Sequence, residues 1–183
     1  GTSVANFCAA RDERGRRLER RVDAQFATAL LLFQQDIIST SGLLCYRAAV
    51  QQAGGFPVGL RAKEDIALVL RLLAQGAVDY LPHVLYRKNF SGRRRAATIL
   101  AGAETFWQLF AAEVRALPPG QFARARAALL GRLAGLALTE GQRGAAWSYL
   151  AQGCHAHPGA CVSAMVAGGG RALRRLPGRA LQN

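Results

Sequence analysis

The amino-acid sequence changes its pattern at Ser91-Gly92, and this change limits the folds that the chain can adopt. Before this point, short apolar runs of strand length alternate with segments of helical periodicity, and Gly or Pro residues separate them. After it, apolar residues recur at helical spacing in one long segment after another. Alternating strands and helices are typical of an α/β layer, whereas successive helices bury their apolar faces against one another. We therefore predict an α/β region over residues 1–92, an all-α region over residues 93–167 and a basic, Gly-rich tail over residues 168–183.

In the α/β region, turn residues divide the chain into short elements. Apolar runs predict strands over residues 4–9, 18–22, 77–81 and 84–89, with a further buried strand at the end of a loop over residues 37–46. Helices are predicted over residues 47–53 and 64–75, and we expect the apolar segment 25–33 to be helical and buried. On helix 64–75, the apolar face consists of Ile66, Val69, Leu70 and Leu73.

In the all-α region, Pro118-Pro119-Gly120 and Gly141 separate the helices. The predicted helices span residues 93–117, 122–138, 143–155 and 158–165. We expect Trp147 and Tyr149 to lie in the core of this region rather than on a ligand-binding surface.

The chain is strongly basic, with a formal net charge of +13 from 24 basic and 11 acidic residues. Lys63 and Lys88 are its only lysines, so the other basic residues are arginine. Such a surface favours anionic partners, although a GC-rich genome that uses Arg for every solvated cation explains the same composition. No nucleic-acid recognition motif accompanies the charge, so we predict no specific nucleic-acid partner. Contact between the basic helices and an anionic membrane surface is a hypothesis.

The overall composition, 51% hydrophobic and 19% charged, is globular rather than disordered. The four cysteines form no CxxC pair, so we expect reduced thiols. No apolar run approaches the ~18 residues that a membrane-spanning helix needs, and no secretory signal is recognisable. These features predict a cytoplasmic protein, with any membrane contact peripheral and at the inner face.

Two adjacent carboxylates, Glu64 and Asp65, open the predicted helix 64–75. The helix dipole favours an anion in the first turn, and the ordinary pKa of Asp keeps it charged and able to accept a proton. The same residues are common helix-capping residues, which stabilise a helix by roughly 0.5–2 kcal/mol. The dipeptide by itself favours capping over catalysis.

A Gly54-Gly55-Phe56 loop precedes these carboxylates. Gly54 and Gly55 are suited both to ending the helix 47–53 and to letting the backbone approach a substrate closely. We expect one glycine to serve each purpose, and we expect Phe56 to anchor the loop in the core.

The order of these motifs resembles that of one family. Ser39-Thr40-Ser41-Gly42 leads into Leu43 to Arg47, and Gly54-Gly55-Phe56, Glu64-Asp65, Tyr80-Leu81-Pro82 and Leu85-Tyr86-Arg87 follow. This order resembles the second half of the catalytic domain of family 2 glycosyltransferases, over residues 4–92 of this chain. The resemblance implies α/β architecture of the GT-A type, which binds nucleotide sugars, followed here by an all-α region. Residues 122–158 also resemble a tetratricopeptide-like helix pair, which needs a neighbour to bury its faces.

The resemblance implies an inverting transfer of a sugar from a nucleotide-diphosphate sugar to a hydroxyl acceptor, as in bacterial cell-envelope polysaccharide biosynthesis. It makes Asp65 the general base and Glu64 a residue that orients the acceptor. Arg87 is either a partner of the donor diphosphate or a solvated residue at a strand end. The implied site consists of Asp65, Glu64, Gly54, Gly55, Phe56, Arg87 and Asn89. Asn89 departs from the His that is frequent at this position in the family.

The family binds Mg²⁺ or Mn²⁺ through an Asp-x-Asp motif that precedes the matched segment, and this sequence contains no Asp-x-Asp. We therefore expect no metal ligands in this chain, and we expect it to be a C-terminal fragment that is inactive by itself. A non-catalytic, basic helical module that binds a partner is the alternative from another class, and a truncated pseudoenzyme is a third interpretation.

A second group of chemically reactive side chains consists of Cys154, His155, His157 and Cys161. Their residue types suit zinc, but the spacing is not that of a zinc finger, and Pro158 interrupts the segment. The alternative is the end of one helix, with a His favoured by the dipole, and the start of the next helix at Pro158.

Overall fold

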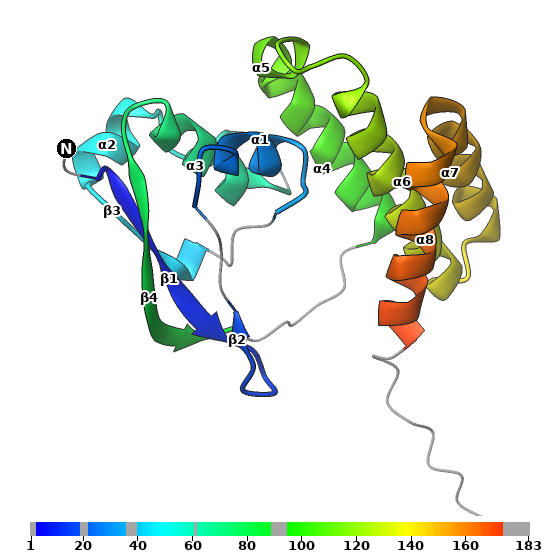
Figure 1. Ribbon diagram of the computed structural model, residues 1–183, viewed down its shortest axis with the longest axis horizontal. Coiled ribbons are helices and arrows are strands. Elements are labelled where there is room, and N and C mark those ends of the chain that lie inside the picture. The colour runs from blue at the N-terminus through cyan, green and yellow to red at the C-terminus, as the bar shows by residue number, and fades with distance from the viewer. Residues whose placement is uncertain (1–2, 19–21, 36–39, 61, 89–94, 174–183) are drawn as a thin grey trace, which may run out of the picture. The chain divides into compact units, whose positions relative to one another are not determined.

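A computed structural model describes residues 3–18, 22–35, 40–60, 62–88 and 95–173, with only the backbone described for residues 168–173 (Figure 1). The chain divides into two compact units. The first contains residues 1–93 and 101–115, and the second contains residues 94–100 and 116–183. The architecture is mixed α/β, with a small sheet in the first unit and a mainly helical C-terminal region.

The sheet is built around β1 (Ala5–Arg11), which is its central strand. β4 (Val78–Arg87) runs parallel to β1 along one edge. On the other edge, β3 (Leu43–Cys45) pairs antiparallel with the first half of β1, and β2 (Arg17–Leu18) pairs antiparallel with its end. The predicted hairpin between the first two strands is confirmed, and Gly15 in its turn has a φ of 75°.

Two strand predictions need correction. The segments 77–81 and 84–89 are one strand, β4, because the chain bulges at Pro82 and His83 and then resumes its pairing: Leu81 lies opposite Cys8, and Val84 lies opposite Ala9. The bulge accommodates Pro82, which has no N–H for a ladder hydrogen bond. β3 is not buried, since the side chain of Leu44 is 69% exposed.

The helices that precede β4 in the first unit include α1 (Phe26–Leu31), α2 (Arg47–Gln52) and α3 (Glu64–Leu73). Phe26 of α1 packs edge-to-face on Phe7 of β1, with ring centroids 6.0 Å apart. The buried residues of α3 are Ile66, Ala67, Leu68, Val69 and Leu72. The predicted apolar face was therefore too narrow, because α3 is covered on more than one side. Two residues of that face, Leu70 and Leu73, are only half-buried.

Residues 93–117, predicted as a single helix, form α4 (Ala96–Leu109) and α5 (Ala111–Arg115) where they are described. Phe106, Trp107 and Phe110 are buried in the first unit. The indole Nε1 of Trp107 donates a hydrogen bond to the carbonyl oxygen of Leu31 at 2.9 Å, which ties α4 to the end of α1.

The second unit contains α6 (Gln121–Thr139), α7 (Arg143–Ala156) and α8 (Pro158–Leu173). Gly141 lies between α6 and α7 with a φ of 75°, as its predicted role as a break requires. The backbone of α8 continues to Leu173, so the predicted tail does not begin at residue 168. Residues 174–183 lie outside the described part.

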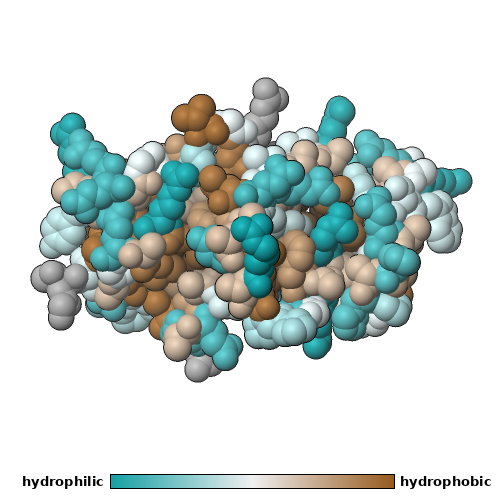
Figure 2. Space-filling model, turned by 90° about the horizontal axis from the view of Figure 1, so that it is seen from above, coloured by the Kyte–Doolittle hydropathy of each residue, from teal (hydrophilic) through white to brown (hydrophobic). Residues whose placement is uncertain are grey.

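The expected core positions were right for Tyr149, which is 8% exposed, and wrong for Trp147, which is 71% exposed. They were also wrong for Phe56, which is 46% exposed. Figure 2 shows apolar side chains interspersed with polar ones on the face in view. Within the described residues, no helix has the length and apolar character that crossing a bilayer requires.

Candidate functional site

The backbone directly before α3 has an unfavourable conformation that side-chain contacts hold in place. Among the described residues, Phe33 and Lys63 are the non-glycine residues with a positive φ, 51° and 69°. The ammonium nitrogen of Lys63 lies 4.8 Å from the ring centroid of Phe33, within the range of a cation–π interaction. The Phe33 ring in turn stacks on Trp107, with centroids 5.0 Å apart. A left-handed backbone is unfavourable for both residue types, so the surrounding packing holds the chain in this conformation directly before Glu64.

Glu64 and Asp65 occupy the first turn of α3 and are half-buried. The Oδ1 atom of Asp65 accepts a hydrogen bond from the backbone N–H of Ile66 at 2.8 Å. This N–H is one of those that a helix start leaves without an intrahelical partner. The Lys63 side chain makes no capping hydrogen bond, whereas Asp65 does contribute to capping. The role of Asp65 as a base stays a prediction.

α3 leads directly into β4, the strand that runs parallel to β1. α3 ends at Leu73, and a short turn leads directly into β4 at Val78 (Figure 1). In Figure 1 the arrowheads of β1 and β4 lie beside β2, at the end of the sheet away from α3. In open α/β sheets, ligands bind outside the carboxyl ends of the parallel strands.

The Gly54-Gly55 turn is a helix end. The N–H of Gly55 donates to the carbonyl oxygen of Val50 at 2.9 Å, and the N–H of Gly54 donates to that of Gln51 at 3.0 Å. These bonds and the φ values of 73° and 66° form a Schellman motif. The prediction that Gly54-Gly55 ends the helix is confirmed, with both glycines rather than one in the motif, and the close approach to a substrate stays a prediction.

Arg71 holds this turn against the C-terminal half of α3. Its Nη1 atom lies 3.3 Å from the carbonyl oxygen of Gly55 and 3.4 Å from that of Ala53. Arg71 is six residues after Asp65, roughly 9 Å further along the helix axis. The structure thus brings Gly55 next to Arg71. The glycine turn therefore contacts the C-terminal half of α3, whereas Asp65 lies in its first turn.

Arg87 is the last residue of β4 and lies opposite Arg11, the last residue of β1. Arg11 in turn lies opposite Arg17 of β2. The strand register therefore places three arginines abreast on one face at the carboxyl end of the sheet. The sequence pattern indicated Arg87 alone, because only the strand register relates it to Arg11 and Arg17. Asn89 lies outside the described residues.

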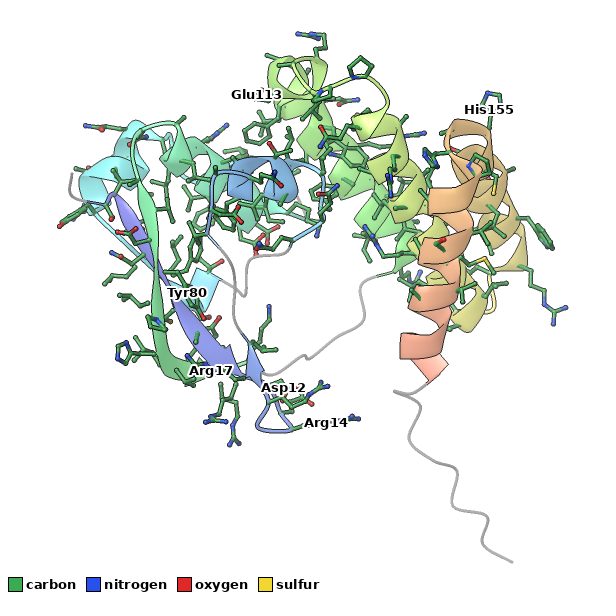
Figure 3. All side chains as sticks on the ribbon, in the orientation of Figure 1. Asp12, Arg14, Arg17, Tyr80, Glu113 and His155 are labelled. Carbon is green, nitrogen blue, oxygen red and sulfur yellow. The ribbon has the colours of Figure 1, made fainter. Side chains whose placement is uncertain are left out.

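The hairpin that carries Arg11 and Arg17 is held by Asp12, which is 3% exposed (Figure 3). Its carboxylate accepts hydrogen bonds from the backbone N–H groups of Arg14 and Arg16, both at 2.9 Å, and from Nε of Arg16 at 2.7 Å. Burial would raise the pKa of Asp12, but these hydrogen bonds and the charge of Arg16 outweigh it and hold the pKa below its ordinary value. The hairpin turn is therefore built on an ionised, internally paired carboxylate.

The group Cys154, His155, His157 and Cys161 does not form a metal site in the described part of the chain, where no three His, Cys, Asp or Glu side chains are arranged to hold an ion. His157 accepts a hydrogen bond at Nδ1 from the N–H of Ala160 at 3.2 Å, so it caps the start of α8. Burial and a hydrogen bond with Cys154 raise the pKa of Cys161 to about 11. The helix-end interpretation is the one that these contacts support.

Comparisons of this chain with protein-family models, with curated proteins and with solved structures found no match.

Proposed function

We propose that this chain is the acceptor-binding part of an inverting glycosyltransferase of the family 2, GT-A type. The observation that carries the proposal is that Glu64 and Asp65 occupy the first turn of α3, the helix that leads directly into the parallel strand β4, and that Arg87 ends β4. Transfer from a diphosphate donor needs a carboxylate base for the acceptor and a cation for the diphosphate. The sequence motifs that resemble the family run through the same elements.

In the proposed reaction, the Asp65 carboxylate accepts the proton of the acceptor hydroxyl while the oxygen attacks the anomeric carbon of the donor sugar. The bond from that carbon to the nucleoside diphosphate breaks with inversion. Glu64 orients the acceptor, and Arg87 pairs with the diphosphate charge. The left-handed conformation at Lys63 fixes where the first turn of α3 begins, so it limits the movement of both carboxylates.

The resemblance also implies a Mg²⁺ or Mn²⁺ ion at the diphosphate. The described residues include no group of three side chains suited to hold a metal ion. The proposed roles of Asp65, Glu64 and Arg87 therefore include no metal ligand.

The test is Asp65→Asn in the natural protein that contains this chain, assayed by release of nucleoside diphosphate. We expect the variant to lower kcat by a factor on the order of 10²–10⁴, with an unchanged circular dichroism spectrum. The matched control is Glu113→Gln, an exposed acid on α5 that should leave the rate unchanged (Figure 3). Transfer by Asp65→Asn at a rate within a few-fold of the wild type would show that Asp65 only caps α3.

A non-catalytic interaction module is the second candidate, and the exposure of Trp147 favours it. This side chain is 71% exposed on α7, and Val166 on α8 is 68% exposed. Trp is frequent among the residues that dominate protein interfaces. If this function is the right one, Trp147→Ala should abolish capture of the partner while Asp65→Asn has no effect.

A further inference from the structure

We infer that Arg17, Arg11 and Arg87 form a binding site for a phosphate group at the carboxyl end of the β1–β4 pair. The register places Arg17 opposite Arg11 and Arg11 opposite Arg87, so the three residues lie on adjacent strands in the order β2, β1, β4. Directly opposed residues share a face of the sheet and have Cβ atoms about 5 Å apart. The three side chains therefore start from adjacent positions on one face of the sheet. Arg87 also belongs to the proposed transferase site, but the inference does not depend on transfer.

Two of the three guanidinium groups are anchored by backbone carbonyls. Nη1 of Arg11 donates to the carbonyl oxygen of Gly15 at 2.7 Å, and Nη2 of Arg17 donates to that of Pro82. The second bond crosses β1 from β2 to β4. A guanidinium has five N–H donors, so a bond to a carbonyl orients it and uses one of the five. These contacts limit the rotamer entropy that binding would cost.

The charge around this row of three arginines (Arg17, Arg11 and Arg87) is strongly positive. Residues 11–18 and 87–88 contain six basic and two acidic side chains. Of the two acids, Asp12 is buried and paired with Arg16 at 2.7 Å, so its charge is compensated within the turn. Like charges directly opposite one another destabilise a sheet. A bound phosphate would offset this repulsion, and the fork of donors on Arg matches phosphate oxygens in geometry.

The location gives the site its ligand class. The row of arginines lies at the carboxyl end of the parallel strand pair, where α/β sheets bind small ligands. Three guanidinium groups on adjacent strands match the charge and the acceptor oxygens of a phosphate or diphosphate group. The phosphate could belong to a soluble nucleotide or to a lipid, and the two sources share this chemistry.

The test is titration calorimetry of the chain with inorganic pyrophosphate at fixed ionic strength, since salt screens exposed charges. We expect saturable binding that Arg11→Gln, Arg17→Gln and Arg87→Gln each weaken by roughly tenfold. The matched control is Arg14→Gln, because Arg14 is exposed in the same hairpin but outside the row (Figure 3). Its affinity should stay within about twofold of the wild type. Binding of pyrophosphate is measured without a donor sugar or an acceptor, so its outcome does not depend on the proposed base.

The inference is overturned if pyrophosphate does not bind saturably, or if Arg14→Gln weakens binding as much as the three row variants do. The latter result would mean that net charge alone attracts the anion. Arg17→Gln could disturb the fold of the hairpin, so a second variant is needed. Arg87→Lys keeps the charge and does not alter the hairpin. It should still weaken binding, because Lys lacks the planar fork of N–H donors that Arg has. Competition with uridine diphosphate or with phosphatidic acid vesicles then distinguishes the nucleotide from the lipid source.

Discussion

At the scale of single residues, the contact between Lys63 and Phe33 is the most unusual feature of the α/β unit. Both residues have a positive φ, and their side chains meet over a distance of 4.8 Å. Strain of this kind persists only where packing over-determines it, as the stacking of Phe33 on Trp107 does here. The contact directly precedes the acid pair that we propose as the reactive centre.

Replacing Lys63 by Ala and by Gly separates the backbone strain from the side-chain contact. Both variants remove the ammonium group, but only Gly adopts a positive φ without a steric cost. We expect Lys63→Gly to be more stable than Lys63→Ala by about 1 kcal/mol. The measurement is urea unfolding followed by Trp107 fluorescence in a Trp147→Phe background. Equal stability of the two variants would show that Lys63 is not held in the left-handed region.

Asp12 gives the hairpin a pH-dependent stability of known sign. Because its folded-state pKa is lowered, the carboxylate stabilises the hairpin in full above the ordinary pKa of about 3.9. This stabilisation is lost as the pH falls through the lower, folded-state pKa. We expect Asp12→Asn to lower the thermal midpoint at pH 7, and the difference from wild type to shrink as the pH falls below about 4. A difference that stayed constant down to pH 2 would contradict this account.

At the scale of elements, the helical unit depends on a close approach between α6 and α8. A Cβ atom added to Gly131 of α6 would lie 2.0 Å from the carbonyl oxygen of Cys161 on α8. A Cβ atom on Gly153 of α7 would lie 2.5 Å from the sulfur of Cys161. Cys161 is fully buried between these two glycines. Small residues therefore set the spacing of the three helices.

Gly131→Ala tests this packing. The new methyl group would meet backbone atoms, which cannot turn aside, so the helices must separate; we expect a loss of about 1–3 kcal/mol. Gly144→Ala is the control, because Gly144 is a helical residue with open space around its Cα. Its variant should be unchanged or up to about 1 kcal/mol more stable. Urea unfolding followed by circular dichroism measures both, and a neutral Gly131→Ala would refute the close approach.

At the scale of the whole molecule, the chain has two cores rather than one. Phe26, Ile66 and Phe106 are buried in the first unit, and Leu130, Ala134 and Cys161 are buried in the second. α4 is the element that contributes residues to both units. The change of pattern at Ser91-Gly92 thus lies near, but not at, the division that the structure makes.

Two cores predict independent responses to mutation. Lys63→Ala acts in the first unit and Gly131→Ala in the second, and their described neighbours are different residues. We expect the destabilisation of the double variant to equal the sum of the single effects within about 0.5 kcal/mol. Larger deviations in a double-mutant cycle, measured by urea unfolding, would show that the two positions are energetically coupled.

Local signals predicted much of the fold. Gly54-Gly55 ended α2, Pro158 began α8, and the charged turn at Gly15 joined the first hairpin, because each depends on backbone conformations that a few neighbouring residues impose. β4 was predicted as two strands because Pro82 interrupts its pattern. Whether a proline ends a strand or lies in a bulge depends on the partner strand, and β1 is about 70 residues away in the sequence.

The sequence by itself determined several helix ends and turns and the position of Glu64 and Asp65 in the first turn of α3, since these follow from local propensity and capping. The tertiary structure alone decided which residues meet. It aligned Arg17, Arg11 and Arg87 through the strand register, brought Lys63 onto Phe33, and left Phe56 and Trp147 exposed. Contacts between residues distant in the chain depend on pairing and packing across the whole unit, and periodicity within one element carries no record of its partner.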